Sequence, residues 1–372
     1  MLKNKNKGIT LVALVITIII LLILAGISIS ALTNTGIFGK AKEAKNASEN
    51  AEKEQKQTLS EYEKELNKYT AQELTNDKVN KVLSETENTI LKDVNGNIFT
   101  LPAGFKITGD ATTVDKGIII EDATVDSNGN ATPTNGSQFV WVPVGEITKT
   151  DGTKTEIKLN RYIFASDGTP IEKNEDVIGP YYQELATSDK GNTVAKNITN
   201  FKNSVKENGG YYIGRYEART GTKRTAAGNA LTQITEKGTD QVYNYVTQQQ
   251  AAERAQGMYT SNNFTSDLMN SYAWDTAITF IQNCTDKTNY ANQNSLNTSL
   301  SQTGTTNDNP CNIFDMASNV LEWTTETSSN SNDPRVLRGG SCNSSNNYTS
   351  VRGIDLTSNS NYHMGFRPLL YL

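Results

Sequence analysis

The N-terminal 32 residues constrain this chain more than any other stretch. An apolar run extends from Ile9 to Leu32 and follows three basic residues, Lys3, Lys5 and Lys7. A helix rises about 1.5 Å per residue, so a run of roughly 20 apolar residues spans the hydrocarbon core of a bilayer. Basic residues on the short side of such a run favour the cytoplasm. The sequence therefore predicts a membrane anchor, with the N-terminus in the cytoplasm and the rest of the chain on the extracellular face.

The residues around Gly8 indicate how this anchor is processed. An ordinary secretory signal has a shorter apolar region followed by its cleavage site, whereas here a glycine precedes the apolar run. This arrangement resembles a type IV prepilin leader. The resemblance implies that a prepilin peptidase cuts between Gly8 and Ile9, leaving residues 1–8 as leader and 9–32 as a transmembrane, pilin-like helix. Fibre-forming pilins carry Glu at the fifth mature position, which is Ala13 here, so efficient fibre assembly is not expected. A plain single-helix anchor is the alternative.

Residues 33–70 predict a charged helical stalk. The stretch from Gly39 to Tyr69 is rich in Ala, Glu, Lys and Gln, lacks Pro, and places Glu and Lys three and four residues apart. Its apolar stripe is thin, which favours a solvated helix or one that packs along a single narrow face. The sequence TNTGIF at residues 33–38 can interrupt the helix. The stripe consists of Leu59, Tyr62, Leu66 and Tyr69.

The pattern changes after residue 70. Residues 71–137 are predicted as a small β-rich region and linker, because apolar and polar residues alternate between turn signals such as Asn95-Gly96. Within it, residues 126–137 (DSNGNATPTNGS) are expected to form a polar loop. A strong strand follows at residues 138–147. The net charge of −5 argues against nucleic acid as a partner, and a single His with three dispersed Cys offers little for a histidine triad or a mononuclear metal site.

Six short motifs follow one another in the second half of the chain. They are FVWVPVGE at residue 139, GGYYIGRYEA at 209, SYAWDTAITFI at 271, NIFDMASNVLEWT at 312, RVLRGGS at 335 and GFRP at 365. Together they resemble the formylglycine-generating (sulfatase-modifying) enzyme family, over residues 138–372. The resemblance implies a loop-rich variant of the C-type lectin fold. The predicted class is therefore α+β: a transmembrane and stalk helix, a small β-rich region and a C-type-lectin-like domain.

The motif residues also have direct physical interpretations. Gly339-Gly340 permits a close backbone approach that a side chain would block. Trp141 and Trp323 are suited to a core, and Trp274, Ala277, Ile278 and Ile281 recur at the spacing of an amphipathic helix. Buried ion pairs are hypothesised between three arginines and two glutamates, with solvated surface charges as the alternative. The five residues are Arg338, Arg352, Arg367, Glu217 and Glu322.

The resemblance also identifies where catalysis would reside. Enzymes of this family hold copper with two cysteines at the third and eighth positions after Gly-Gly-Ser, which are Ser344 and Thr349 here. A hydroxyl is a poor ligand for a soft metal, so no oxidase activity and no catalytic residues are expected. The family also binds calcium through the stretch that matches Asp315 to Trp323. Asp315 and Glu322 are the candidate ligands, and calcium is the one cofactor implied; a salt-bridged loop without metal is the alternative.

The segment from Ser341 to Met364 is the candidate binding surface, because 15 of its 24 residues are Asn, Ser, Thr or Tyr. Tyrosine supplies rigid amphipathic area, and Asn and Ser supply adaptable hydrogen bonding. The candidate residues are Asn343, Ser345, Asn346, Asn347, Tyr348, Ser350, Asp355, Asn359, Asn361, Tyr362 and His363.

Two functions remain open at this point. The first is a membrane- or pilus-anchored, adhesin-like protein that binds a surface glycan or protein. In a sharper variant, the segment resembles regions diversified by a mutagenic retroelement, which randomises adenines; the alternative is an ordinary Asn/Ser-rich loop. The second is a minor pilin or pseudopilin with a structural role, whose partners would be other pilins.

Overall fold

The computed structural model describes residues 17–23, 37–173, 177–178, 181–182, 195–220, 238–330, 332 and 334–372. The chain divides into two compact units, residues 1–63 and 64–372. Residues 17–23 are helical, but the rest of the apolar run and the Gly8–Ile9 cleavage site lie outside the described residues. Among the helices described, none combines the length and hydrophobicity needed to cross a membrane.

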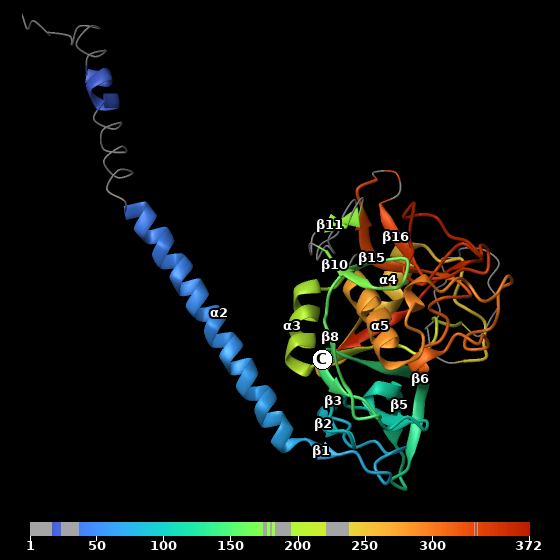
Figure 1. Ribbon diagram of the computed structural model, residues 1–372. Helices are drawn as coiled ribbons and strands as arrows, with labels where there is room; N and C mark the ends of the chain where they lie inside the picture. Colours follow the sequence, from blue (N-terminus) through green and yellow to red (C-terminus); the bar gives the residue numbers. More distant parts are fainter. Residues whose placement is uncertain are drawn as a thin grey trace, which may run out of the picture. The chain divides into compact units, whose positions relative to one another are not determined.

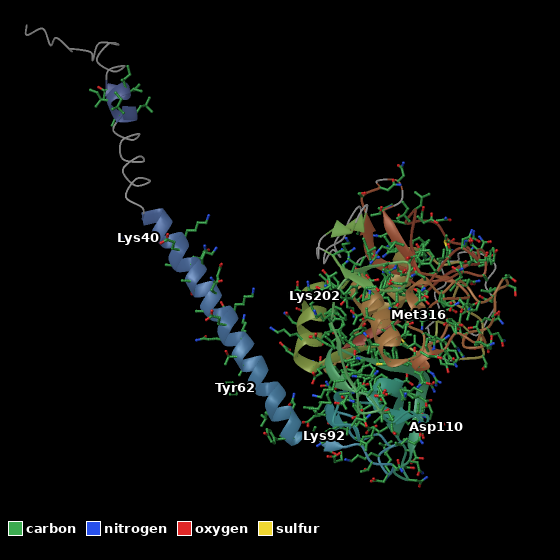
Figure 2. All side chains as sticks on the ribbon, in the orientation of Figure 1. Lys40, Tyr62, Lys92, Asp110, Lys202 and Met316 are labelled. Carbon is green, nitrogen blue, oxygen red and sulfur yellow. The ribbon has the colours of Figure 1, made fainter. Side chains whose placement is uncertain are left out.

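The stalk prediction matches a single helix, α2 (Ile37–Thr70), which crosses the division between the two units. Its predicted apolar stripe is exposed, with Tyr62 71% and Tyr69 82% accessible (Figure 2). Lys56 and Glu52 form a 2.8 Å ion pair one helical turn apart. Such exposed pairs stabilise a helix only slightly, so α2 is a solvated helix.

The second unit is β-rich, with mixed α and β elements (Figure 1). Its largest antiparallel sheet joins distant parts of the chain in the order β14-β19-β13-β6-β5-β4. The C-terminal strand β19 therefore lies inside this sheet, between β14 and β13. The strands are β4 (Phe105–Thr108), β5 (Ile119–Val125), β6 (Ala131–Pro143), β13 (Gly210–Gly214), β14 (Thr265–Leu268) and β19 (Pro368–Tyr371).

Strand β6 begins earlier than the sequence predicts. Residues 131–137, expected as part of a polar loop, belong to β6, and residues 131–133 pair with β5. One Asp122 carboxylate oxygen accepts the backbone N–H groups of Asn135, Gly136 and Ser137 at 2.9, 2.6 and 3.2 Å, where the pairing register shifts. This bulge holds a polar strand in place without apolar alternation. The domain boundary predicted at residue 138 consequently falls inside β6, and residues 105–125 share a sheet with the strands that follow.

A second sheet carries the C-terminal motifs. Its order is β11-β12-β15-β16-β17, and β18 pairs in parallel with β15. Strand β16 leads directly into the Gly-Gly turn, where a Cβ on Gly340 would lie 1.9 Å from the Ala317 carbonyl oxygen. The predicted need for glycine is thus confirmed. The strands are β11 (Val177–Ile178), β12 (Tyr181–Tyr182), β15 (Leu321–Ser328), β16 (Arg335–Arg338), β17 (Arg352–Asp355) and β18 (Met364–Phe366).

Three helices pack with these sheets. The predicted amphipathic helix is α5 (Ser271–Cys284), which begins where the Asn270 side chain accepts the Ala273 N–H. Helix α4 (Gln248–Gln256) begins with a capping box formed by Thr247 and Gln250, and α3 (Ile198–Asn208) ends at Gly209 with φ 72°. All three tryptophans of the chain, Trp141, Trp274 and Trp323, are fully buried.

The remaining elements are short. They are β1 (Gln72–Glu73), β2 (Thr89–Lys92) and β3 (Ile98–Leu101) in one small sheet, the β7 (Gly145–Thr148) and β8 (Lys154–Ile157) hairpin, the β9 (Tyr162–Phe164) and β10 (Pro170–Glu172) hairpin, and the 3-10 turns η1 (Val114–Lys116), η2 (Tyr290–Asn292) and η3 (Pro310–Asn312).

Candidate ligand-binding face

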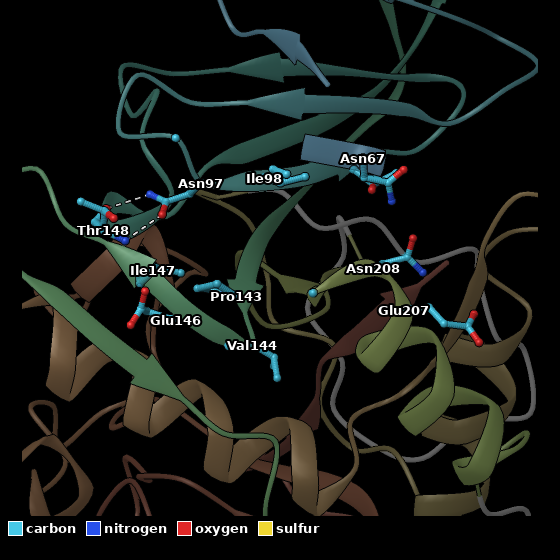
Figure 3. Close-up of a pocket in the computed structure, with 14 residues that line it drawn as sticks. Asn67, Asn97, Ile98, Pro143, Val144, Glu146, Ile147, Thr148, Glu207 and Asn208 are labelled. Carbon is cyan, nitrogen blue, oxygen red and sulfur yellow. Dashed lines mark hydrogen bonds between the residues drawn. The ribbon is translucent and has the colours of Figure 1, made fainter. Parts of the chain in front are cut away.

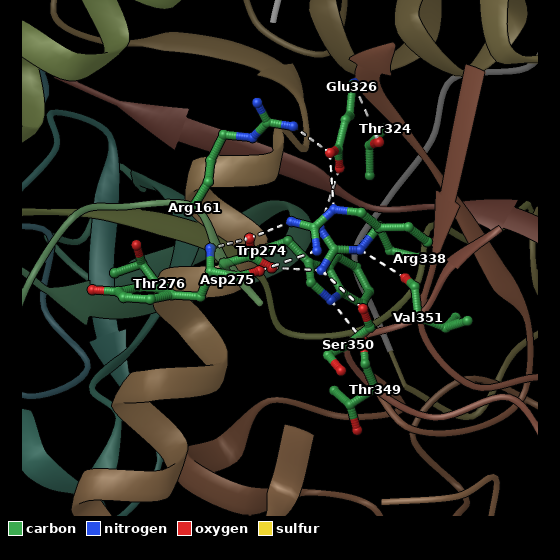
Figure 4. A network of polar contacts seen from close by, with 12 residues as sticks. Arg161, Trp274, Asp275, Thr276, Thr324, Glu326, Arg338, Thr349, Ser350 and Val351 are labelled. Carbon is green, nitrogen blue, oxygen red and sulfur yellow. Dashed lines mark hydrogen bonds and ion pairs between the residues drawn. The ribbon is translucent and has the colours of Figure 1, made fainter. Parts of the chain in front are cut away.

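A buried network of five charged side chains lies beneath the C-terminal segment (Figure 4). Arg338 from β16 contacts Asp275 of α5 at 2.5 Å and Glu326 of β15 at 3.4 Å. Arg352 from β17 contacts the same two carboxylates at 2.5 and 2.9 Å. Arg161, which precedes β9, adds a 2.5 Å contact to Glu326. The network thus ties one helix to three strands through charge-assisted hydrogen bonds.

The arginines outnumber the carboxylates in this network by three to two. Burial raises the pKa of Asp275, but Arg338 and Arg352 outweigh burial and hold that pKa below its usual value. Burial, and then the charge of Arg352, lowers the pKa of Arg338. Asp275 is therefore ionised at neutral pH, and its carboxylate has no proton to donate in acid–base chemistry.

The same side chains hold the backbone of the segment above them. Trp274 Nε1 donates to the Thr349 carbonyl at 2.9 Å, and Arg338 Nε donates to the Val351 carbonyl at 2.8 Å (Figure 4). Arg338 Nη2 also reaches the Ser350 carbonyl at 3.4 Å. Each acceptor is a main-chain oxygen, so these contacts do not depend on the side chains at residues 349–351.

A neighbouring loop supports the segment from a second direction. Residues 291–295 follow α5 and run beside residues 347–350, with an isolated β-bridge between Asn294 and Tyr348. Three backbone hydrogen bonds join the two stretches: Ser295 N to Asn347 O at 3.1 Å, Thr349 N to Gln293 O at 3.1 Å, and Ser350 N to Ala291 O at 3.0 Å. The Thr349 hydroxyl adds a hydrogen bond of 3.5 Å to the Gln293 carbonyl.

The structure brings most of the predicted binding residues to the surface. Ser350 is the exception: it is only 9% exposed because its backbone N–H and carbonyl are both held from below. We therefore remove Ser350 from the candidate contact residues. The exposed members are Asn343, Ser345, Asn346, Tyr348 and Tyr362; the half-buried members are Asn347, Asp355, Asn359, Asn361 and His363.

Side-chain contacts join the two ends of the segment. The Tyr362 hydroxyl donates to Asn343 Oδ1 at 2.7 Å, which links residues 19 positions apart. The Asn359 amide donates to both oxygens of Asp355 at 3.0 and 2.9 Å. His363 packs its ring edge-to-face against Tyr362 at 5.0 Å, and burial lowers the pKa of this histidine. Residues 343–348 and 354–363 thus form one surface, named here the polar face.

Sequence reasoning missed three apolar residues at the polar face. Ile354 and Leu356 lie within the segment and are 37% and 49% exposed. Leu296, on the loop that supports Tyr348, is 48% exposed. The prediction favoured Asn, Ser and Tyr and passed over aliphatic residues. Ile354 lies in β17, an edge strand of its sheet.

The two positions that correspond to the copper cysteines differ in their surroundings. Thr349 is fully buried, and Ser344 is half-buried with its hydroxyl accepting the Asn346 N–H at 3.2 Å. The adjacent Cys342 is 6% exposed, and burial raises the pKa of its thiol to about 11. The hydroxyls therefore act in local structure, and the neighbouring thiol is protonated at neutral pH.

The candidate calcium ligands Asp315 and Glu322 both accept hydrogen bonds from protein groups. Both Glu322 oxygens accept from the Arg367 guanidinium, at 3.0 and 2.7 Å. The Asp315 oxygens accept the Gly304 N–H at 2.8 Å and the Thr306 hydroxyl. Among the described residues, no group of three or more His, Cys, Asp or Glu side chains is placed to hold a metal ion. The geometry favours the salt-bridged alternative.

The hypothesised ion pairs are thus correct in part. Arg367 pairs with Glu322, but Arg338 and Arg352 pair with Asp275 and Glu326. Glu217 instead accepts the Val320 N–H at 3.0 Å and the Asn319 side-chain amide at 2.5 Å. All of these side chains are completely shielded from solvent except that of Arg352, which is 7% exposed.

A cleft of about 400 Å³ lies elsewhere in the second unit, along β3, β7 and the end of α3 (Figure 3). Asn97 crosses one end of it and exchanges two 2.8 Å hydrogen bonds with the Thr148 backbone. Glu146 and Glu207 are among the residues that line it (Figure 3). None of the predicted binding residues lines this cleft, so it is separate from the polar face.

Comparison with known proteins bears on the last third of the chain. Residues 240–370 match the family described as "Sulfatase-modifying factor enzyme 1-like domain". The match includes α4, α5 and the whole polar face, which confirms that part of the resemblance. It does not by itself make the domain catalytic. No curated protein sequence matches the chain.

Three solved structures are also similar to this chain at low levels. The Major Tropism Determinant I1 variant has a TM-score of 0.32 and 14% identity, over 80% of this chain and 85% of that one. The U1 variant has a TM-score of 0.33 and 14% identity over the same shares. The P3c variant has a TM-score of 0.30 and 13% identity, over 80% of this chain and 98% of that one.

Proposed function

We propose that this chain is a cell-surface, adhesin-like protein that binds a glycan or protein ligand through the polar face. The observation that carries the proposal is the separation of roles in the C-terminal segment. Its backbone is held by Trp274, Arg338 and the 291–295 loop, while the side chains of Asn343, Asn346 and Tyr348 are exposed. A rigid scaffold that presents free side chains is the usual arrangement of a binding site on loops.

The composition of the polar face suits recognition. Tyr348 and Tyr362 supply large amphipathic surfaces, and the amides between them supply donors and acceptors. The exposed Ile354, Leu356 and Leu296 add apolar area of the kind that becomes buried when a partner docks. Both glycan and protein ligands use aromatic and amide groups, so the ligand class is left to experiment.

The proposal is tested by binding of the purified full chain to an array of glycans and cell-surface proteins. We expect selective binding to one ligand class, with loss of at least tenfold in affinity on Tyr348→Ala, since aromatic residues dominate hot spots. The matched control is Tyr62→Ala, which removes an exposed tyrosine from α2. Equal loss in both variants, or binding that survives Tyr348→Ala, would contradict the assignment.

We extend the proposal to the N-terminal region, with the apolar run as a membrane anchor, the N-terminus in the cytoplasm and the second unit outside the cell. Support comes from the basic residues before the run and from the long polar helix α2 after it. Protease treatment of intact cells should digest the second unit. Co-purification with fibres, and loss of fibres on deletion, would instead favour the structural role of a minor pilin.

We also propose that residues 342–363 were diversified by adenine-directed mutagenesis. Their side chains are mostly exposed or half-buried, and substitutions there leave the backbone contacts in place. The decisive observation is genomic: a near-identical template repeat that differs only at adenines, beside a reverse transcriptase. If no such repeat is found, the diversification proposal is wrong and the segment is an ordinary polar loop.

Formylglycine synthesis offers a direct test against an enzymatic role. With hydroxyls at 344 and 349, copper loading should leave a sulfatase-type cysteine peptide unoxidised. Mass spectrometry of the peptide after incubation with copper and the full chain checks this, using a copper-dependent family enzyme as positive control. Clear aldehyde formation would overturn the non-enzymatic assignment.

A further inference from the structure

Two of the three cysteines meet in one surface pocket. Cys284 is the last residue of α5 and Cys311 is the middle residue of η3, and α5 packs against η3. Both thiols line a pocket of about 410 Å³, together with Asp115 and Asn312. Each side chain is only 8% exposed. Cys342, on the polar-face segment, does not line this pocket.

The surrounding structure holds both thiols in place. Cys311 Sγ donates to the Asp115 carbonyl at 3.8 Å. Its neighbour Asn312 donates from Nδ2 to the carbonyls of Lys116 and Gly117, at 3.0 and 2.9 Å. On the other side, the α5 terminus is closed by Thr285, whose N–H and hydroxyl both donate to the Ile281 carbonyl. The two residues are therefore presented by anchored turns.

We propose that Cys284 and Cys311 form a redox pair that closes into an intramolecular disulfide. One thiol loses its proton and attacks a sulfur of a low-molecular-weight disulfide, releasing one thiol and leaving a mixed disulfide. The second protein cysteine then attacks the mixed disulfide, forms the Cys284–Cys311 bond and releases the remaining half of the small disulfide as a thiol. The two protein thiols lose two electrons and two protons, and the small disulfide is reduced to two thiols. This assignment is independent of the proposed ligand-binding function.

The bond would close residues 285–310 into a loop. That loop contains residues 291–295, whose backbone supports residues 347–350 of the polar face. A cross-link restricts the open states of the segment it encloses. The disulfide would thus brace the loop that supports residues 347–350, without involving any exposed binding residue.

The rate of closure should depend on pH. Burial, and then the charge of Asp115, raises the pKa of Cys284 to about 12. Burial, then Cys284, then Asp115, raises the pKa of Cys311 well above its usual value. Lys116 and Lys149 act in the opposite direction on Cys284. Only the thiolate attacks a disulfide, so closure is slow at neutral pH and accelerates as the pH rises.

The test is oxidation of the native full chain with oxidised glutathione at about pH 8.5, followed by unfolding in the presence of an alkylating agent and peptide mapping. We expect a loss in mass of two hydrogens, one cross-linked peptide pair containing Cys284 and Cys311, and Cys342 alkylated. Hydrogen exchange in residues 291–295 should slow on the order of tenfold, and reduction should reverse this.

Cys342→Ser is the matched control and should retain the cross-link, whereas Cys284→Ser and Cys311→Ser should each abolish it. Three outcomes would overturn the proposal: both cysteines still alkylated after prolonged oxidation, glutathione adducts in place of the cross-link, or a cross-link that includes Cys342. All three are read from the wild-type protein, so they do not depend on whether a variant folds.

Discussion

Two buried charged clusters in the second unit have opposite compositions. The cluster beneath the polar face holds three arginines and two carboxylates. The other, around the DMASNVLEW motif, holds Arg367 with four buried carboxylates: Glu217, Asp308, Asp315 and Glu322.

The comparison teaches that burial alone does not decide the charge of a group. In the arginine-rich cluster, cations outweigh burial and keep the pKa of Asp275 low. In the acid-rich cluster, burial raises the pKa of all four carboxyls, and Asp308 reaches about 6. The first cluster is a fixed electrostatic clamp, and the second binds protons as the pH falls.

The largest expected effect is that of Asp275→Asn. It removes one of two carboxylates from three arginines, so Arg338 and Arg352 lose most of their compensation. Breaking a buried ion pair in this way costs about 3–5 kcal/mol in the free energy of unfolding. Urea denaturation followed by the fluorescence of the three buried tryptophans measures it. A cost below about 1 kcal/mol would mean that the arginines relax towards solvent and that the cluster is no clamp.

The next effect is the pH dependence of the wild-type chain. The Asp308 pKa of about 6 exceeds the value of roughly 4 for an unfolded aspartate, so between these pH values the native state binds more protons. The free energy of unfolding should therefore fall as the pH rises from about 4 to 6, by on the order of 2 kcal/mol from this group. Asp267, with a pKa of about 6, acts in the same direction. Asp275 has the opposite sign: its contribution is lost as the pH falls.

Asp308→Asn is the counterpart of the first substitution and should cost less. Asp308 accepts from the Tyr290 hydroxyl at 2.8 Å and from the Ala317 N–H at 2.6 Å, and an amide retains one of these acceptors. We expect a cost of about 1 kcal/mol at pH 5 and a flatter stability profile between pH 4 and 7. The same urea series measures both, and an unchanged pH profile would assign the titration to another group.

The smallest effect is expected outside both clusters. Asn346 is exposed on the polar face, and only its backbone N–H is hydrogen-bonded, to Ser344 Oγ. Asn346→Ala should change the free energy of unfolding by no more than about 0.5 kcal/mol. The two denaturation curves should superimpose. A large shift would show that side chains of the polar face carry part of the fold.

The sequence predicts those parts of the fold whose cause is local. Helix α5 follows from the spacing of Trp274 and its partners, and the Gly339-Gly340 turn follows from the torsional freedom of glycine. Strand β6 extends back to Ala131 across a bulge where Asp122, on the preceding strand, accepts three N–H groups, and no local alternation reveals this. Likewise, the sequence supports buried ion pairs of the arginines only as a hypothesis, because their partner Asp275 lies more than 60 residues away within an amphipathic helix.

The candidate site likewise has some features that the sequence predicts and others that it does not. Exposure of the Asn, Ser and Tyr residues could be anticipated from composition. The burial of Ser350 could not, because it depends on Arg338 and on Ala291 from another loop. The exposed aliphatic residues Ile354, Leu356 and Leu296 were missed because their exposure depends on tertiary packing, which the local sequence does not reveal. The cysteine pair was equally invisible, since residues 284 and 311 are joined only through the packing of α5 against η3.

The carbonyl contacts at Thr349, Ser350 and Val351 have a consequence for evolution. Every amino acid carries a main-chain carbonyl, so a lineage can accumulate changes along the neighbouring surface without approaching the stability threshold below which a protein is lost from a population. Substitutions on this surface can then produce new binding specificities as fast as mutations arise, while the fold is retained.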